Sequence, residues 1–314
     1  MIEYEVSKIQ QEYRIIGRSE ELREALLAVK AKKHILIEGP VGVGKTVIAM
    51  ALANHFKRGI IRVDGDERYT EQKMVGWFDP PQVMSKGYSN DAFIEGPLTR
   101  AMRDGAFLFI NELNRMPEGT QNVLLPAMDE RKIEIPKIGT VVAEDGFLII
   151  ATQNPEEYIG TSRLSEALKD RFLCIRLNYQ SEEEEEAIVK KETNCLDDLL
   201  VKIAVKVCRK TREHPDVRRG SSVRGAIDIV SIMQQINPQR LSNSDISKIK
   251  KDLETATIMS LASKVELREG SHEKLIEILH KTVEEVLKGI VPQEVPIIEE
   301  PPKEHSENFR RPSL

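Results

Sequence analysis

A glycine-rich stretch, GPVGVGKT at 39–46, constrains the fold of this chain more than any other feature. It matches the pattern G-x-x-x-x-G-K-[ST], and it lies between an apolar run, HILIE at 34–38, and a helix-like run, VIAMALANHF at 47–56. This pattern indicates phosphate binding only where a strand precedes it and a helix follows it. Because both flanks are present, we predict a phosphate-binding loop rather than an ordinary glycine turn.

Phosphate binding at this loop assigns roles to particular side chains. Lys45 is placed to reach the β- and γ-phosphates, and the Thr46 hydroxyl is placed to hold Mg²⁺. Backbone amides of the loop and the positive end of the following helix suit the other phosphate oxygens. We therefore expect ATP and Mg²⁺ as cofactors. The predicted nucleotide-binding residues are Gly39, Pro40, Val41, Gly42, Val43, Gly44, Lys45, Thr46 and Val47, with Ile16 and Gly17 ahead of the loop.

Short apolar runs recur along the chain and are separated by helix-like or polar stretches. They are typical of buried strands and lie at 59–66, 106–112 and 147–155, with a last strand within 160–177. Buried strands joined by helices favour a parallel sheet that is covered on both faces. The predicted fold class is therefore α/β, with a phosphate-loop core in which helices flank a parallel sheet.

The sequence pattern changes after residue 180. Only helical periodicity follows, and its first element is a glutamate run behind Ser181, which fits a solvated helix N-terminus better than a metal site. A segment rich in proline and glutamate comes last and has no period, which is typical of disorder. The predicted division is a lead-in at 1–19, an α/β nucleotide-binding domain at 20–180, an all-helical C-terminal domain at 181–288 and a disordered tail at 289–314.

Composition narrows the classes of function. The chain has 46 Lys and Arg against 51 Asp and Glu, so its formal net charge of −5 argues against a nucleic-acid partner. No apolar run approaches the ~20 residues of a membrane span, and the charged N-terminus differs from a signal peptide. The three cysteines form no C-x-x-C pair, which favours reduced thiols. A cytoplasmic protein with no membrane partner is expected.

Two stretches are longer than simple connections. Residues 70–95 combine glycine, proline and polar residues with the only tryptophan, and 131–146 has two β-like pieces around a glycine turn, which predict a hairpin. Long loops in compact domains are often functional. Either Trp77 and Phe78 simply pin the first stretch to the core, or that stretch contacts a substrate or a neighbouring subunit.

A nucleotide-hydrolysing site needs a metal-holding acid and a water-activating residue at a strand end beside the phosphate loop. The run FLFINE places Glu112 at such an end, where its carboxylate can accept a proton from the attacking water. The residue before it is Asn111, whose amide oxygen can face the metal but brings no negative charge. Two consequences remain open: slower hydrolysis, or a protein that binds ATP and barely turns it over.

Three further polar residues complete the candidate catalytic set. Asn154 follows the next strand and can hold the attacking water, although an asparagine before proline also suits a turn. Arg171 begins the last strand and could stabilise phosphoryl charge at another subunit, or it could form a salt bridge with an acid such as Asp170. Arg224, near the start of a helix in the second domain, could bring positive charge over the nucleotide.

The order of these motifs resembles that of the AAA+ ATPases, and within them the MoxR family of the dynein-related, magnesium-chelatase-like subgroup. NELNRMPEGTQNVLLPAMDE at 111–130 is similar to that family's Walker B stretch except at Asn111, where the family has Asp. ATQNPEEYIGT at 151–161 is similar to its sensor 1, SEALKDRF at 165–172 to its arginine-finger stretch, and GSSVRG at 220–225 to its sensor 2. The resemblance extends over about residues 12–290.

This resemblance implies roles and partners. It places the arginine finger on Arg171 and sensor 2 on Arg224, and it makes the helical domain a lid over ATP. It identifies 131–146 as the pre-sensor 1 hairpin and 72–95 as the helix 2 insert, which face the ring surface or pore. It further implies a homo-oligomeric, commonly hexameric ring with chaperone-like work on a client protein or metal centre, often beside a von Willebrand A-domain partner. A magnesium-chelatase-like subunit and a nucleotide-gated assembly module with little turnover are the alternatives.

Overall fold

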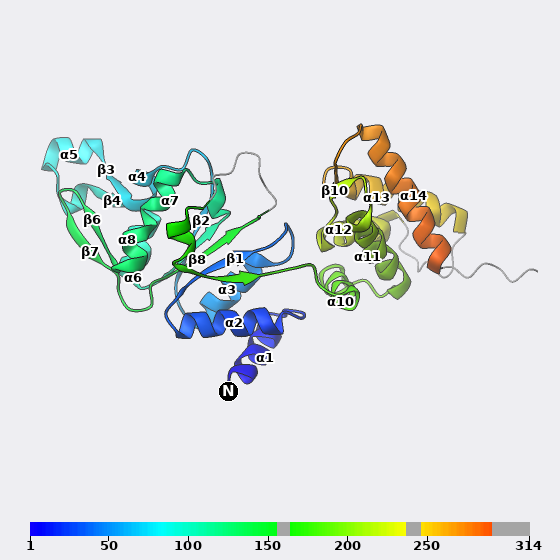
Figure 1. Ribbon diagram of the computed structural model, residues 1–314, viewed down its shortest axis with the longest axis horizontal. Coiled ribbons are helices and arrows are strands. Elements are labelled where there is room, and N and C mark those ends of the chain that lie inside the picture. Colours follow the sequence, from blue (N-terminus) through cyan, green and yellow to red (C-terminus); the bar gives the residue numbers. More distant parts are fainter. Residues whose placement is uncertain (156–163, 237–245, 291–314) are drawn as a thin grey trace, which may run out of the picture.

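The computed structural model describes residues 1–155, 164–236 and 246–290, with the backbone alone for 246–248. Figure 1 shows a parallel sheet with helices against it and, beside it, a bundle of helices. One extended segment, which follows the last strand of the sheet, connects the two parts. The arrangement matches the predicted α/β core followed by a helical part.

The five strands of the main sheet are parallel and follow the order β2-β5-β8-β1-β9. Their bounds are His34–Glu38 (β1), Ile60–Asp64 (β2), Phe107–Asn111 (β5), Leu148–Gln153 (β8) and Phe172–Arg176 (β9). Each predicted strand is present. Because β8 lies between β1 and β5, the ends of the strand before the phosphate loop and of the strand before Glu112 are separated by only one strand.

The strands are buried on both faces because successive side chains point in opposite directions. Ile35 and Phe107 belong to a core shared with the helices α1, α2 and α3. Leu36 and Leu108, one residue further along the same strands, belong to a second core that involves α6 and α8. The continuous apolar runs in the sequence reflect this two-sided burial. The helices are α1 (Ile2–Glu12), α2 (Ser19–Lys30), α3 (Lys45–His55), α6 (Pro97–Asp104), α7 (Glu118–Asn122), α8 (Leu124–Asp129) and α9 (Glu166–Lys169), with the 3₁₀ turn η2 (Leu113–Arg115).

The stretch 70–95 is more regular than its composition suggests. It contains α4 (Glu71–Val75), β3 (Gly76–Phe78), α5 (Pro80–Lys86), η1 (Asn90–Ala92) and β4 (Phe93–Glu95), and β3 pairs with β4 in antiparallel fashion. The predicted hairpin at 131–146 is confirmed as β6 (Lys132–Ile135) and β7 (Gly139–Val142). Phe78 packs on Phe93 within the insertion, and Phe93 in turn packs against the core of the sheet, whereas Trp77 is 43% exposed and does not pin the insertion.

Helices dominate the C-terminal part, as predicted. They are α10 (Glu182–Thr193), α11 (Asp198–Glu213), α12 (Val223–Ile236), α13 (Ile246–Leu261) and α14 (His272–Ile290). The sequence pattern missed one short antiparallel pair, β10 (Val217–Arg219) with β11 (Glu266–Leu267), because strands this short have no periodicity. These helices share a hydrophobic core of their own, which contains Val201, Ala226 and Leu279. Because the helices have this separate core, we propose a domain boundary between residues 180 and 181.

Local details refine the predictions. The lead-in contains α1, whose Val6 and Ile9 pack against the α2–α3 side of the sheet. The helix α2 begins at Ser19, behind Arg18, which has a left-handed backbone (φ 64°). Ser181 caps α10, in a reciprocal arrangement with Glu184. The predicted disordered tail begins inside α14, and its residues 291–314 lie outside the described part.

Candidate nucleotide-binding site

The phosphate loop follows β1 and leads directly into α3, which begins at Lys45. Gly44 precedes the helix with φ 94°, a conformation that suits glycine, and a Cβ there would meet no atom within 4 Å. The backbone at this point is therefore open to a ligand. The Lys45 side chain is only 7% exposed, and its ammonium donates to the carbonyl oxygens of Gly39 (2.6 Å) and Pro40 (2.9 Å). The cation thus lies within the loop, where a phosphate chain would be neutralised.

A pocket of about 280 Å³ adjoins the loop and lies between the α/β part and the helical part. Four groups of residues line it: the phosphate loop and the start of α3 (with Gly42, Val43, Gly44 and Val47), the lead-in (with Ile16), the interdomain segment and α10 (with Gln180 and Lys191), and α12 (with Arg224). Its volume is close to the lower limit of about 300 Å³ for small-ligand pockets. Ile16, Gly42, Val43, Gly44 and Val47 were predicted to bind the nucleotide and Arg224 was predicted as a catalytic residue, and the structure brings all six to this pocket. Gly39, Pro40, Val41, Lys45 and Thr46 lie in the loop beside the pocket, and Gly17 follows Ile16.

Arg18 connects the lead-in to both sides of this pocket, a role the sequence did not indicate. Its guanidinium donates to the carbonyl oxygens of Val43 (3.1 Å) and Asn178 (2.7 Å) and pairs with Glu21 (2.7 Å). Gln180 supports the same corner by donating to the Ile16 carbonyl (2.7 Å). The lead-in, the loop and the interdomain segment are therefore bonded directly to one another.

Asn111 ends β5 and is hydrogen-bonded on both sides. Its Nδ2 donates to Asp64 Oδ1 (2.9 Å), and its Oδ1 accepts from Thr152 Oγ1 (3.1 Å). Asp64 and Asn111 are direct partners in the β2–β5 register. Pairing with Arg62 and, secondarily, with Asn111 holds the pKa of the Asp64 carboxyl below its usual value. A negative charge is therefore present beside Asn111 at the carboxyl ends of the strands, but Asp64 on β2 carries it and not a residue on β5.

Glu112 follows with a left-handed backbone (φ 60°), which few residues other than glycine adopt. Its amide donates to Thr152 Oγ1 (2.9 Å), and its carboxylate pairs with Arg115 Nε at 3.1 Å. Strain of this kind is common at functional sites, where the surrounding structure enforces it. Thr152 thus fixes both residues of the Asn111–Glu112 pair, and the carboxylate lies at the same sheet edge as the phosphate loop.

Asn154 directly follows β8, between the ends of β1 and β5, and is 2% exposed. The rest of the sensor-1-like stretch, 156–161, lies outside the described residues. The position of Asn154 is compatible with the predicted role in holding water. A turn role does not by itself explain such deep burial of a polar side chain, since buried polar groups are costly unless bonded.

Arg171 is held within its own chain. Its Nε and Nη2 contact the Asp129 carboxylate at 2.6–2.7 Å, and Nη1 donates to the Ala167 carbonyl. The sequence suggested Asp170 as a salt-bridge partner, but the bonded acid is Asp129 at the end of α8. The Arg171 side chain is 29% exposed, so it remains accessible from outside.

The helical part approaches the phosphate loop through the segment before α12. A Cβ on Gly42 would lie 2.3 Å from Ser222 Oγ and 3.7 Å from Arg224 Cδ, so the glycine permits this contact. The segment is held from behind by Arg212, whose Nε donates to the Ser221 carbonyl (2.6 Å). Arg224 is exposed and lines the pocket.

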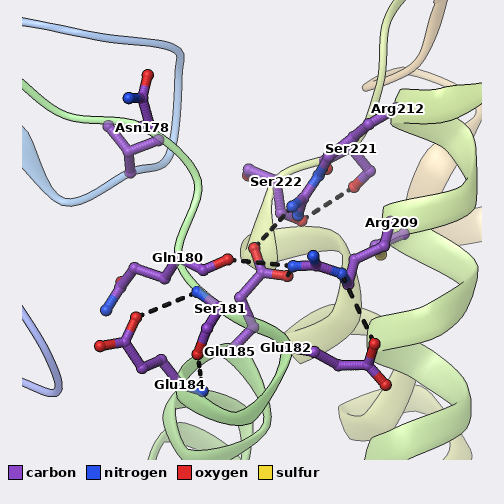
Figure 2. A network of polar contacts seen from close by, with 12 residues as sticks. Asn178, Gln180, Ser181, Glu182, Glu184, Glu185, Arg209, Arg212, Ser221 and Ser222 are labelled. Atoms are coloured by element: carbon purple, nitrogen blue, oxygen red, sulfur yellow. Dashed lines mark hydrogen bonds and ion pairs between the residues drawn. The ribbon is translucent and has the colours of Figure 1, made fainter.

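Figure 2 shows the polar network behind this contact. Glu185, 2% exposed, receives Arg212 at 2.8 Å and Arg209 at 3.1 Å, and Arg209 also donates to the Gln180 carbonyl (3.1 Å). The Arg212 guanidinium stacks 3.9 Å above the Tyr179 ring. The network connects the interdomain segment to the loop that touches Gly42. Its members are far apart in sequence, so no local motif could have revealed it.

The polar side chains near the phosphate loop can be compared with the ligands that Mg²⁺ prefers. Mg²⁺ in nucleotide sites is usually held by a hydroxyl, one or two carboxylates and the phosphates. Thr46 is the second residue of α3, and Glu112 follows β5 at the same end of the parallel strands, while within 1–155, 164–236 and 246–290 no cluster of three His, Cys, Asp or Glu could hold a metal unaided. The donors fit a metal that arrives with a triphosphate, held by Thr46 and by the Asn111 end of β5.

Comparisons with known proteins agree with this geometry. Residues 34–172 match the model of the AAA domain, dynein-related subfamily. The gas vesicle ATPase GvpN of Haloferax mediterranei is 31% identical over 268 residues, which cover 80% of this chain and 73% of that protein. The uncharacterised protein YojN of Bacillus subtilis is 29% identical, with 77% of this chain and 81% of that protein covered.

A solved structure gives the same fold. The Holliday junction branch migration motor RuvB of Thermotoga maritima superposes with a TM-score of 0.51 at 19% identity, over 76% of this chain and 70% of that chain. Among the described residues, no helix combines the length and apolarity needed to cross a bilayer. The sheet, the phosphate loop and the relatives together place this chain in the dynein-related subfamily of AAA ATPases.

Proposed function

We propose that the chain is an ATP-hydrolysing, MoxR-type AAA ATPase that remodels or helps mature a client protein or metal-centre complex. The observation that carries the proposal is the convergence of Lys45, Glu112 and Asn154 at one sheet edge, beside a pocket shared with the lid. The name of the relative GvpN, a gas vesicle ATPase, supports hydrolysis. A cytoplasmic setting and a von Willebrand A-domain partner belong to the same proposal.

Each side chain has a task in this proposal. Lys45 and the loop amides bind the phosphates, and Thr46 holds the metal that neutralises them. Glu112 accepts a proton from water that Asn154 positions, after its carboxylate leaves Arg115. Ile16 and Arg18 line the pocket on the side proposed for the base, with Gly17 between them in the chain, and Arg224 adds positive charge from the helical part.

Phosphate release tests the hydrolytic part. Purified protein should release phosphate from ATP with millimolar Mg²⁺, and Lys45→Ala should reduce the rate at least about 100-fold because the phosphate-binding cation is lost. Glu67→Ala, an exposed change outside the pocket, is the matched control. A wild-type rate no higher than that of Lys45→Ala would overturn the assignment as an ATPase.

We also propose that Arg171 acts on the nucleotide of a neighbouring copy in a ring, commonly a hexamer. Its partial exposure and its position at the start of β9 support this role, and Asp129 would hold it until a neighbour docks. Mixing Glu112→Gln with Arg171→Ala subunits tests it, because some mixed interfaces regain both groups. Partial recovery of activity is expected, and its absence in assembled mixed rings would contradict action in trans.

One observation favours a second candidate, a nucleotide-gated assembly module with little turnover. Both ends of the Asn111 amide are already hydrogen-bonded to protein, which reduces its capacity to serve a metal. Asn111→Asp distinguishes the two functions. A gain in rate of about tenfold or more would favour the gated module, whereas an unchanged rate would favour a working site that uses Asn.

A further inference from the structure

A second large cavity lies away from the nucleotide pocket, with which it shares no lining residue. It is a groove of about 1160 Å³ between the insertion at 71–95 and the segment that runs from α7 through β6. Its walls are mainly apolar and include Trp77, Phe78, Tyr88 and Ile133. In Figure 1 these elements lie on the side of the sheet remote from the helical bundle.

The groove presents aromatic side chains that the fold does not bury. Trp77 is 43% exposed and Tyr88 is 62% exposed, although Tyr88 packs edge-on against Phe78 with ring centroids 4.9 Å apart. Aromatic residues in a desolvated pocket contribute most of the binding energy at many protein interfaces. A volume above the usual upper limit of about 1,000 Å³ for small-ligand pockets fits a peptide segment better than a metabolite.

The rim of the groove determines the charge of its partner. Glu71, Glu130 and Glu134 line it, with Lys132 as the one cation among the lining residues. Lys132 is already paired with Glu130 at 2.9 Å. The remaining two carboxylates leave a negative rim around an apolar floor, and complementary charge across an interface favours basic partners.

We propose that this groove binds an extended client segment in which apolar residues, one of them aromatic, are flanked by lysine or arginine. The inference deepens the proposed function, because it names the chemistry by which a client would be recognised. The apolar residues would fill the space beside Trp77 and Tyr88, and the basic flanks would face Glu71 and Glu134.

Trp77 is the only tryptophan in the chain, so its fluorescence reports occupancy of the groove. The probe is a heptapeptide with a Leu-Phe-Leu core and two lysines on each side, titrated into the full chain without nucleotide. Saturable binding with a blue shift is expected because the exposed indole becomes covered. A peptide with glutamates in place of the lysines should bind at least fivefold more weakly, and one with a serine core should not shift the emission.

Variants locate the binding. Tyr88→Ala should weaken binding of the lysine peptide at least fivefold, whereas Tyr4→Ala, a change at another exposed tyrosine, on α1, should have no effect. Glu134→Lys should remove the preference for the lysine peptide because it brings the net charge of the rim from −2 to zero, whereas Glu67→Lys, a change at an exposed acid outside the groove, should leave the preference intact. Because Glu134 is an exposed strand residue, this loss of preference remains a test even where Tyr88→Ala perturbs the insertion.

The outcomes separate this inference from the proposed function. ATP hydrolysis without any peptide-induced change at Trp77 would overturn the groove and leave the ATPase intact. Peptide binding in a chain without hydrolysis would support the groove and reject the ATPase. If no peptide binds and Glu134→Lys instead changes the oligomeric state in sedimentation, the groove is an interface between copies, and the proposal is wrong.

Discussion

The two sides of the candidate nucleotide site, which we name the sheet wall and the lid wall, are held in place by different means. The sheet wall consists of the phosphate loop at 39–46 with Asn111, Glu112 and Asn154, all of which directly follow or end parallel strands. The lid wall consists of residues 178–181 and 220–224. These residues are held by the buried Glu185 carboxylate, which forms ion pairs with Arg209 and Arg212. Backbone register fixes the first wall, whereas long-range side-chain contacts fix the second.

This difference determines how each wall responds to substitution. A side chain at the end of a strand can change while the ladder that positions it remains, so the sheet wall should lose chemistry without losing stability. The lid wall depends on charges that are largely buried, and removal of one partner leaves the others unsatisfied. Substitutions there should affect stability and nucleotide binding together.

The largest effect is expected from Glu185→Gln. The change leaves Arg209 and Arg212 without their carboxylate, and breaking a buried pair costs about 3–5 kcal/mol. Denaturation followed by helical circular dichroism should show the helical part unfolding earlier, while Trp77 fluorescence reports an unchanged α/β part. Glu182→Gln on the same helix is the control, because that carboxylate is 33% exposed and lies 3.9 Å from Arg209. Equal stability of the two variants would remove the contrast between the walls.

Glu112→Gln should affect only chemistry. Loss of the proton acceptor should lower turnover by about 100-fold, equivalent to about 2.7 kcal/mol in the barrier. Nucleotide affinity and the unfolding free energy should stay within about 0.5 kcal/mol of wild type, since the substitution keeps the shape of the side chain. Titration with a fluorescent ATP analogue and chemical denaturation check these two quantities. A loss of stability comparable to that of Glu185→Gln would contradict a wall fixed by register.

The same contrast explains what the sequence could predict. The strands, the phosphate loop, Glu112 and Asn154 were predictable because local patterns place them at strand ends. Arg18, Asp64 and Arg212 were not, because each acts through a contact with a residue distant in the chain, such as Val43, Asn111 or Glu185. The partner of Arg171 was missed for the same reason: Asp170 is adjacent in sequence, but Asp129 is the acid in contact.

Acid should destabilise the sheet from the end of the strands that lies opposite the phosphate loop. His34 begins β1, and burial lowers its pKa to about 4 while its Nδ1 accepts from the Ile149 amide (2.9 Å). The unfolded chain protonates near pH 6.5, so stability present above that pH is lost as pH falls toward 4. Between pH 7.5 and 4.5 the loss from this residue is about 2.5 kcal/mol.

His34→Asn isolates that contribution, because its amide oxygen can still accept a hydrogen bond but does not titrate. Unfolding monitored by Trp77 fluorescence at both pH values should show a smaller acid loss in the variant than in wild type. His280 on α14, which is partly exposed, provides the control substitution, His280→Asn, in the helical part. Parallel pH profiles for wild type and His34→Asn would contradict a role for the buried imidazole.

The smallest effect is expected at Asp64, whose carboxylate lies on β2 beside Asn111 and not at position 111 of β5 itself. If Asp64 supplies through Asn111 the negative field that an aspartate at 111 would supply directly, Asp64→Asn should raise the Mg²⁺ concentration for half-maximal nucleotide binding about fivefold. That change corresponds to about 1 kcal/mol, as expected for a partly exposed charge. Asp66→Asn, a change at an acid two residues beyond β2 that is paired with Arg68, should leave the Mg²⁺ dependence unchanged. The double variant Asp64→Asn with Asn111→Asp returns the carboxylate to β5 and should recover the wild-type value. Failure to recover it would mean that the hydrogen bonds of Asn111, rather than the charge, set the metal affinity, and the sheet wall would then share the side-chain dependence of the lid wall.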